Sequence, residues 1–133
     1  WRYKFGFERC GEEKIYNAAF RITDPGKTVN ASIYFPGTSY ASLRLIKDAA
    51  QAAFPIADAA ADAKGCKSRF IQDMEVIKAP HTLKENGKLY EGAWIENWLI
   101  SVCGKLVDTE VVFIPNQKIG GVNFHSRKAT LRN

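Results

Sequence analysis

The C-terminal half of the chain alternates apolar and polar residues almost without interruption, and this pattern constrains the fold more than any other feature. Strand-like segments cover residues 68–78, 88–103, 106–114 and 119–126. Short period-2 segments separated by turn residues are typical of strands that follow one another in an antiparallel meander. We therefore predict a sheet of about four consecutive strands in this half.

Two turn sequences fix how these strands pair. Asn86-Gly87 predicts a tight hairpin, because both central residues of a type I′ turn need positive φ. Gly104-Lys105 is expected to close the next hairpin, which places Trp98 opposite Val111. The side predicted to face the core also carries Trp94, Ile100, Val102, Val107 and Phe113, and the opposite, mixed side carries Ile95, Asn97, Leu99, Ser101, Asp108 and Glu110.

A helix is predicted between these strands and the N-terminal part of the chain. Apolar residues recur at helical spacing through residues 43–61, and Thr38 or Ser39 is expected to cap the start. Gly65 is suited to the C-terminal cap. Pro55 interrupts the pattern, so we expect one long helix kinked there or two short helices.

The N-terminal residues predict three further strands, at 1–8, 14–23 and 28–35, with turns at 10–13 and 24–27. An apolar stripe lies along the first of them: Trp1, Tyr3, Phe5 and Phe7. If this hairpin closes over the sheet, its aromatic rings belong to the core. Otherwise they form an exposed patch that marks a protein partner.

Length and composition are those of one domain. A chain of 133 residues with 46% hydrophobic residues can bury a core without metal or a dense disulfide framework. No apolar run is long enough for a transmembrane segment. We predict a single α+β domain over residues 1–133: an antiparallel meander sheet, with an N-terminal hairpin and a short strand, wrapped around one long helix. This order resembles the cystatin-like and NTF2-like topologies, which imply no activity.

One C-terminal pattern resembles small exported bacterial proteins of unassigned function. It runs from Trp94-Ile-Glu96-Asn-Trp98 through Cys103-Gly104-Lys105 to Val111-Val-Phe113-Ile-Pro115. The resemblance implies export to an oxidising compartment, periplasmic or secreted, and a disulfide to Cys103. The start at Trp1 without Met agrees with processing of a longer chain.

The three cysteines allow several pairings. Cys66 precedes the first strand of the meander and Cys103 ends the second, so both lie at the same end of that hairpin. A regular ladder from Asn86-Gly87 would set Cys103 opposite Phe70, so a Cys66–Cys103 bond requires an irregularity near Pro80. A bond involving Cys10 and a chain without any disulfide are the alternatives.

Few residues suggest chemistry. No motif for a nucleophile, a phosphate, a metal or another cofactor is present. Glu96 falls on the core face between Trp94 and Trp98, where it could act as a proton donor. It could equally lie at the sheet margin or pair with Arg or Lys. The two tryptophans are either core residues or walls of an apolar ligand pocket.

The formal charge is +5, from 19 basic and 14 acidic residues, and the last 19 residues contain no acid. Lys118, Arg127, Lys128 and Arg132 are expected to form a solvated tail or to bind an anionic partner. Folding is expected not to need the part after Ser126, which carries Arg127, Lys128 and Arg132. Without a nucleic-acid-binding module, nucleic acid is a poor candidate.

These features favour an exported, non-enzymatic accessory or binding protein of the bacterial envelope, with a protein partner or a small apolar ligand. The alternative is a small hydrolase or isomerase that uses Glu96. A third reading is a binder of an anionic polymer or surface through the tail. A Glu96 at the bottom of an open cavity would favour the enzyme, and one sealed in an ion pair would favour the binding protein.

Overall fold

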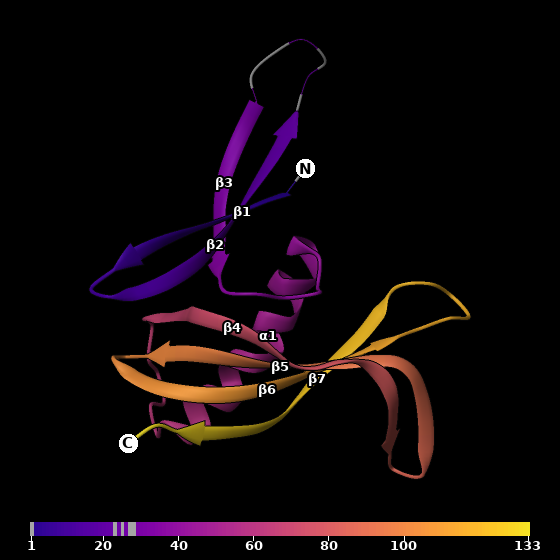
Figure 1. Cartoon of the computed structure of the whole chain (residues 1–133). Helices are drawn as coiled ribbons and strands as arrows, with labels where there is room; N and C mark the ends of the chain where they lie inside the picture. Colours follow the sequence, from indigo (N-terminus) through magenta and orange to yellow (C-terminus); the bar gives the residue numbers. More distant parts are fainter. Residues whose placement is uncertain (1, 23, 25, 27–28) are drawn as a thin grey trace.

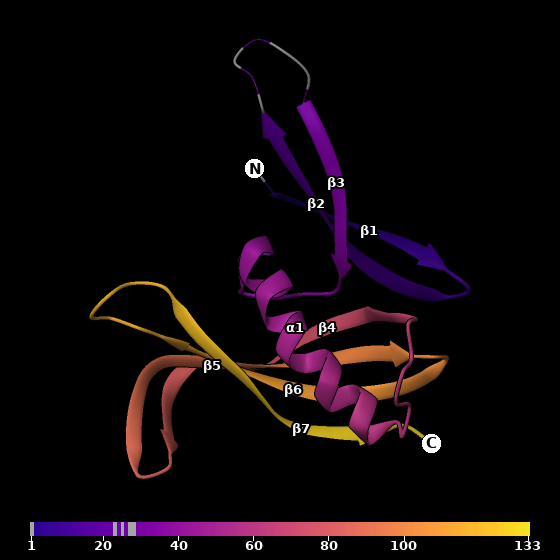
Figure 2. The same cartoon turned by 180° about the vertical axis from the view of Figure 1, so that it is seen from behind.

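The computed structural model describes residues 2–22, 24, 26 and 29–133, which form two antiparallel sheets and one helix (Figures 1 and 2). The first sheet contains β1 (Arg2–Arg9), β2 (Glu12–Ile22) and β3 (Val29–Pro36) in chain order. The second contains β4 (Arg69–Glu85), β5 (Lys88–Val102), β6 (Lys105–Pro115) and β7 (Val122–Leu131), also in chain order. The helix α1 (Leu43–Ala60) lies across one face of the second sheet. The predicted α+β fold, with a meander sheet around one helix, is confirmed.

The N-terminal strands form a sheet of their own, which projects away from the second sheet (Figure 1). Tyr3 and Phe7 are therefore largely exposed. Trp1 and two residues of the predicted 24–27 turn, Pro25 and Lys27, fall outside the described residues.

The helix-facing side of the second sheet is the one that the alternation predicts. Trp94, Trp98 and Phe113 are buried there against the small residues of α1. Alanine lines the buried stripe of the helix, which allows its backbone to approach the tryptophans closely: Ala49, Ala50, Ala53 and Ala57. Val122 and Phe124 of β7 pack against the same core.

The predicted register between β5 and β6 is wrong by two residues. Trp98 pairs with Thr109, not Val111, because the turn residues are Cys103 and Gly104, both with positive φ. This is the type I′ hairpin geometry, in which Lys105 already belongs to the strand. A shift of two residues preserves the side to which each side chain points, so the predicted faces still hold.

The opposite face is less exposed than predicted. The far half of the β4–β5 hairpin bends, and Leu83 packs with Ile95 and Val112 in a second apolar cluster. The bend coincides with register shifts on both sides of His81, next to Pro80, where an irregularity was expected. Proline cannot donate to the ladder, so β4 can continue through this point only with a local break.

Both ends of the helix differ from prediction. Ser42, not Thr38 or Ser39, is the N-cap, and its hydroxyl accepts a hydrogen bond from the Leu45 amide. The helix ends at Ala60, before Gly65, and Lys105 of β6 donates to the Ala61 carbonyl at 2.7 Å. A lysine there complements the negative end of the helix dipole. A single helix runs through Pro55.

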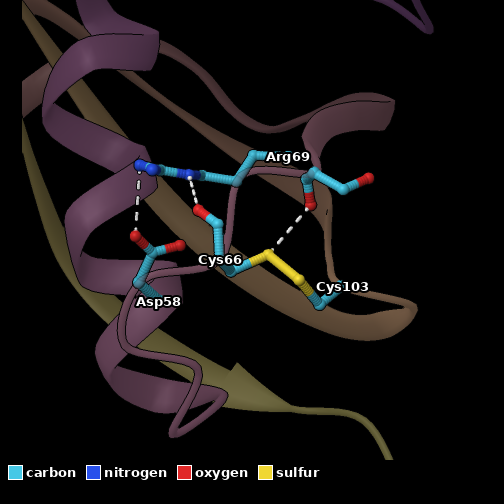
Figure 3. A network of polar contacts seen from close by, with 5 residues as sticks. Asp58, Cys66, Arg69 and Cys103 are labelled. Carbon is cyan, nitrogen blue, oxygen red and sulfur yellow. Dashed lines mark hydrogen bonds and ion pairs between the residues drawn. A yellow bond between two sulfur atoms is a disulfide. The ribbon is translucent and has the colours of Figure 1, made fainter.

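The Cys66–Cys103 disulfide is confirmed, with a Cα separation of 6.0 Å. The β4–β5 ladder ends at Arg69 opposite Val102, so Cys66 reaches Cys103 from the loop outside the ladder. Arg69 holds that loop, since it donates to the Cys66 carbonyl and pairs with Asp58 of α1 (Figure 3). On the chain-entropy model, closing a loop of this length stabilises the fold by about 4 kcal/mol.

The basic C-terminal residues are not a solvated tail. β7 continues to Leu131 and pairs with β6 along its length, with a bulge after Glu110. Arg127 pairs with Glu110, and Arg132 forms two hydrogen bonds with Asp108. The Arg132 hydrogen bond, helped by Asn97, lowers the pKa of the Asp108 carboxyl.

This pairing predicts that truncation after Ser126 destabilises the protein by about 2–4 kcal/mol, because several ladder hydrogen bonds each contribute about 1 kcal/mol. Urea denaturation followed by circular dichroism measures the change. Truncation after Arg132 removes only Asn133 and is the control, with unchanged stability expected. Equal stability of the two truncated chains would show that residues 127–132 are dispensable for folding.

Candidate functional site

Glu96 occupies the centre of the core and is completely buried. From Trp94 to Val102 the even-numbered residues of β5 point toward α1, so the carboxylate lies on the same face as Trp94 and Trp98. The segment between β3 and α1 passes over it, because Gly37 and Thr38 attach this segment to neighbouring strands. Gly37 has a φ of +94°, and a Cβ there would collide with the Met74 backbone of β4.

Four groups donate hydrogen bonds to this carboxylate. Oε1 accepts from the Ser39 hydroxyl at 2.8 Å, the Tyr40 amide at 3.0 Å and the Trp94 indole at 2.9 Å. Oε2 accepts from the Trp98 indole at 2.9 Å. Indole and amide groups can only donate, and the Ser39 oxygen itself accepts from the Ala41 amide. The site is thus a set of donors built around an acceptor.

A second layer connects this site to the N-terminal sheet. Arg2 of β1 donates to the Ala41 carbonyl at 3.1 Å and to Asn17 Oδ1 at 2.6 Å and 2.9 Å. Asn17, itself buried, donates to the carbonyls of Phe35 and Gly37. Burial lowers the pKa of the Arg2 guanidinium, and the charge of Glu96 opposes that shift. The Arg2 guanidinium is thus part of the same network as Glu96.

This geometry suits a structural anchor. A general acid must reach the atom that receives its proton, whereas the Glu96 oxygens are sealed under the 39–41 segment and between two indoles. Trp94 and Trp98 are 7% and 0% exposed, and Trp94 stacks on Phe113 with ring centres 4.9 Å apart. The structure therefore brings the three predicted residues together in the core.

An accessible cleft of about 480 Å³ lies between the two sheets. One wall comes from β2 and includes Lys14 and Tyr16; the other comes from β4 and β5 and includes Phe70 and Leu99. Cys10, an exposed free thiol in the β1–β2 turn, also lines it. Figure 1 shows this turn on the same side of the molecule as the β5–β6 turn.

Aromatic side chains extend the cleft onto the N-terminal sheet. Tyr16 stacks between Phe5 and Phe7, with centroid distances of 6.0 Å and 4.9 Å. Phe7 is 44% exposed and Phe70 on the other wall is 50% exposed. The predicted exposed aromatic patch is thus present in the described part of the stripe. Sequence reasoning missed Phe70 and Leu99, since only tertiary structure brings the outer face of β4–β5 to the N-terminal hairpin.

The described residues contain no group of three or more His, Cys, Asp or Glu side chains that could hold a metal ion. Nor does any helix among them have the length and apolar character needed to cross a membrane.

The hydrogen bonds of Glu96 predict unequal effects of removing its two indole donors. Trp98→Phe removes the indole that donates to Glu96 Oε2. It should lower the free energy of unfolding by about 1–3 kcal/mol, because a buried acceptor is left unsatisfied. Trp94→Phe is the matched control, because Oε1 keeps Ser39 and Tyr40 and a phenyl ring can still stack on Phe113. Urea denaturation of both variants measures the difference, and an equal or reversed order would contradict this assignment.

Comparison with protein-family models, with curated proteins and with solved structures finds no match to this chain. The function is therefore argued from the geometry of the two regions described above.

Proposed function

We propose that this chain is an exported, non-enzymatic binding protein of the bacterial envelope that holds an apolar segment of a partner protein in the cleft between its sheets. The observation that carries the proposal is an exposed aromatic surface: Phe70 lines the cleft, and Phe7 stacks on the cleft residue Tyr16 just outside it. Exposed apolar residues gathered around a concave surface are typical of protein interaction sites. The sealed environment of Glu96 supports a binding protein over the hydrolase or isomerase.

The walls indicate what kind of segment would fit. Tyr16, Phe70 and Leu99 offer apolar area, while Lys14, ion-paired with Glu12 at 3.3 Å, and Gln72 offer polar groups. A segment with one or two large apolar side chains, and with backbone groups free to hydrogen-bond, would match both the apolar area and the polar groups of the walls. The disulfide supports the export part of the proposal, because such bonds persist mainly in oxidising compartments.

A small apolar ligand is the second candidate for the same cleft. Its volume lies within the range of about 300–1,000 Å³ that small-molecule sites occupy. The aromatic surface that continues past the cleft onto β1 favours the protein segment, since a small molecule would leave Phe7 uncovered.

Cys10 provides a test, because it is the free thiol at the cleft. Peptides would be selected from a random display library on the wild-type protein and counter-selected on Phe70→Ser. The reaction of Cys10 with Ellman's reagent is then followed with and without each peptide. We expect apolar-rich peptides that slow this reaction about tenfold and bind Phe70→Ser at least about tenfold more weakly.

Ile77→Ser is the matched control, since Ile77 lies on the same strand as Phe70, is 43% exposed and does not line the cleft. Its peptide affinity should equal that of the wild type. Peptides that bind Phe70→Ser as well as the wild type, and leave Cys10 equally reactive, would contradict the proposal. Selective protection of Cys10 by the apolar dye bis-ANS, without any selected peptide, would favour the small ligand instead.

A further inference from the structure

The two most exposed large apolar residues among those described are Ile119 at 85% and Leu89 at 67%. Ile119 lies in the β6–β7 loop and Leu89 at the end of the β4–β5 hairpin. Figures 1 and 2 both show these hairpins protruding at one end of the molecule, opposite the β5–β6 turn that carries Cys103. This end is distinct from the aromatic cleft.

The β6–β7 loop is organised so that Ile119 points away from the core. Asn116 Oδ1 accepts hydrogen bonds from the amides of Lys118 and Ile119 at 3.1 Å and 3.3 Å. The Asn116 amide donates to the Gly121 carbonyl at 3.0 Å and closes the loop. An Asn side chain that holds the following amides is a defined turn. The exposure of Ile119 is therefore a property of an ordered loop.

The β4–β5 tip is fixed relative to this loop. Glu85 Oε1 lies 3.2 Å from His125 Nε2 of β7, which joins the tip to the strand that follows the loop. Leu83 and Tyr90 pack with Ile114 in the second apolar cluster. These contacts fix the two hairpins relative to one another, and a groove of about 470 Å³ lies between them, lined among others by Leu89, Tyr90 and Lys118.

Exposed lysines flank each apolar tip. Lys88 precedes Leu89 in the sequence, and Lys84 lies opposite Leu89 in the β4–β5 ladder. Lys118 precedes Ile119. Two acids also lie here, because Glu85 contacts His125 and Glu91 accepts a hydrogen bond from Thr82, so the three lysines outnumber the acids by one. The surface therefore combines two convex apolar points with positive charge.

We propose that this end of the molecule docks on a bilayer that contains anionic lipids. Ile119 and Leu89 enter the boundary between headgroups and acyl chains, while Lys84, Lys88 and Lys118 contact the anionic headgroups. Interfacial binding grows with the apolar area buried and with attraction to anionic lipid, and stable attachment needs both. A fluid bilayer can accommodate two separated convex tips, whereas a protein partner would need two matching hollows.

Flotation with vesicles of phosphatidylcholine alone, or mixed with phosphatidylglycerol, tests the proposal on the full chain. We expect the wild type to float with the mixed vesicles and the Leu89→Ser/Ile119→Ser variant to lose about tenfold or more of that binding. Lys84→Glu/Lys88→Glu/Lys118→Glu should lose a similar amount. High salt should weaken wild-type binding, because it screens exposed charges.

Ile22→Ser and Lys64→Glu are the matched controls, since both residues are exposed and far from the tips in sequence. Both should float like the wild type, and circular dichroism should show every variant folded. Wild-type protein that stays unbound, or tip variants that bind as well as the controls, would overturn the proposal. So would equal binding to vesicles without phosphatidylglycerol, or capture of a protein by the tips with no vesicle binding. None of these outcomes bears on the aromatic cleft.

Discussion

The buried carboxylate of Glu96 is the constraint on which the rest of the structure depends. Moving such a group out of water costs several kcal/mol unless hydrogen bonds replace its hydration. Four donors do so here, and they come from different parts of the chain: the indoles of β5 and the Ser39 and Tyr40 groups of the segment before α1. Satisfying this one group therefore fixes where the helix begins and how two tryptophans are oriented.

The same network explains why the two sheets diverge. Ser39 donates its hydroxyl hydrogen bond to Glu96 and does not cap the helix, which begins only after Ser42, and the preceding Gly37 lies against the β4 backbone. The N-terminal sheet is attached through this short segment and through Arg2 and Asn17. It does not cover the outer face of β4–β5. The cleft and its exposed aromatic rings are the consequence.

The alternation of apolar and polar residues correctly predicted which side chains face the core. The strand register, which depends on the exact turn residues, was predicted less well. Trp94, Glu96 and Trp98 share a face because side chains alternate along a strand. The register error of two residues did not change which face each side chain occupies. The error arose at Cys103, a residue that rarely adopts positive φ and so hides the type I′ turn. The Cys66–Cys103 bond could be anticipated from chain order, although the loop geometry that permits it could not.

Three other features needed tertiary structure. Ser39 was predicted as a helix cap because it precedes the helix in sequence, but in the folded chain its hydroxyl donates to the distant Glu96. Arg127 and Arg132 read as a solvated tail because their partners, Glu110 and Asp108, lie on another strand. The net charge of the last residues alone therefore does not reveal the acids that pair with these arginines. Phe70 likewise meets the N-terminal hairpin only in the folded chain.

Hydrogen exchange of Glu96→Gln, measured by mass spectrometry on peptides from β1 and β2, tests the central role of this carboxylate most directly. The substitution keeps the shape of the side chain but turns one acceptor into a donor that faces other donors. We predict faster exchange in β1 and β2, because the 39–41 segment that attaches their sheet loses its anchor, along with a lower free energy of unfolding. Unchanged exchange in both strands, with unchanged stability, would contradict the account.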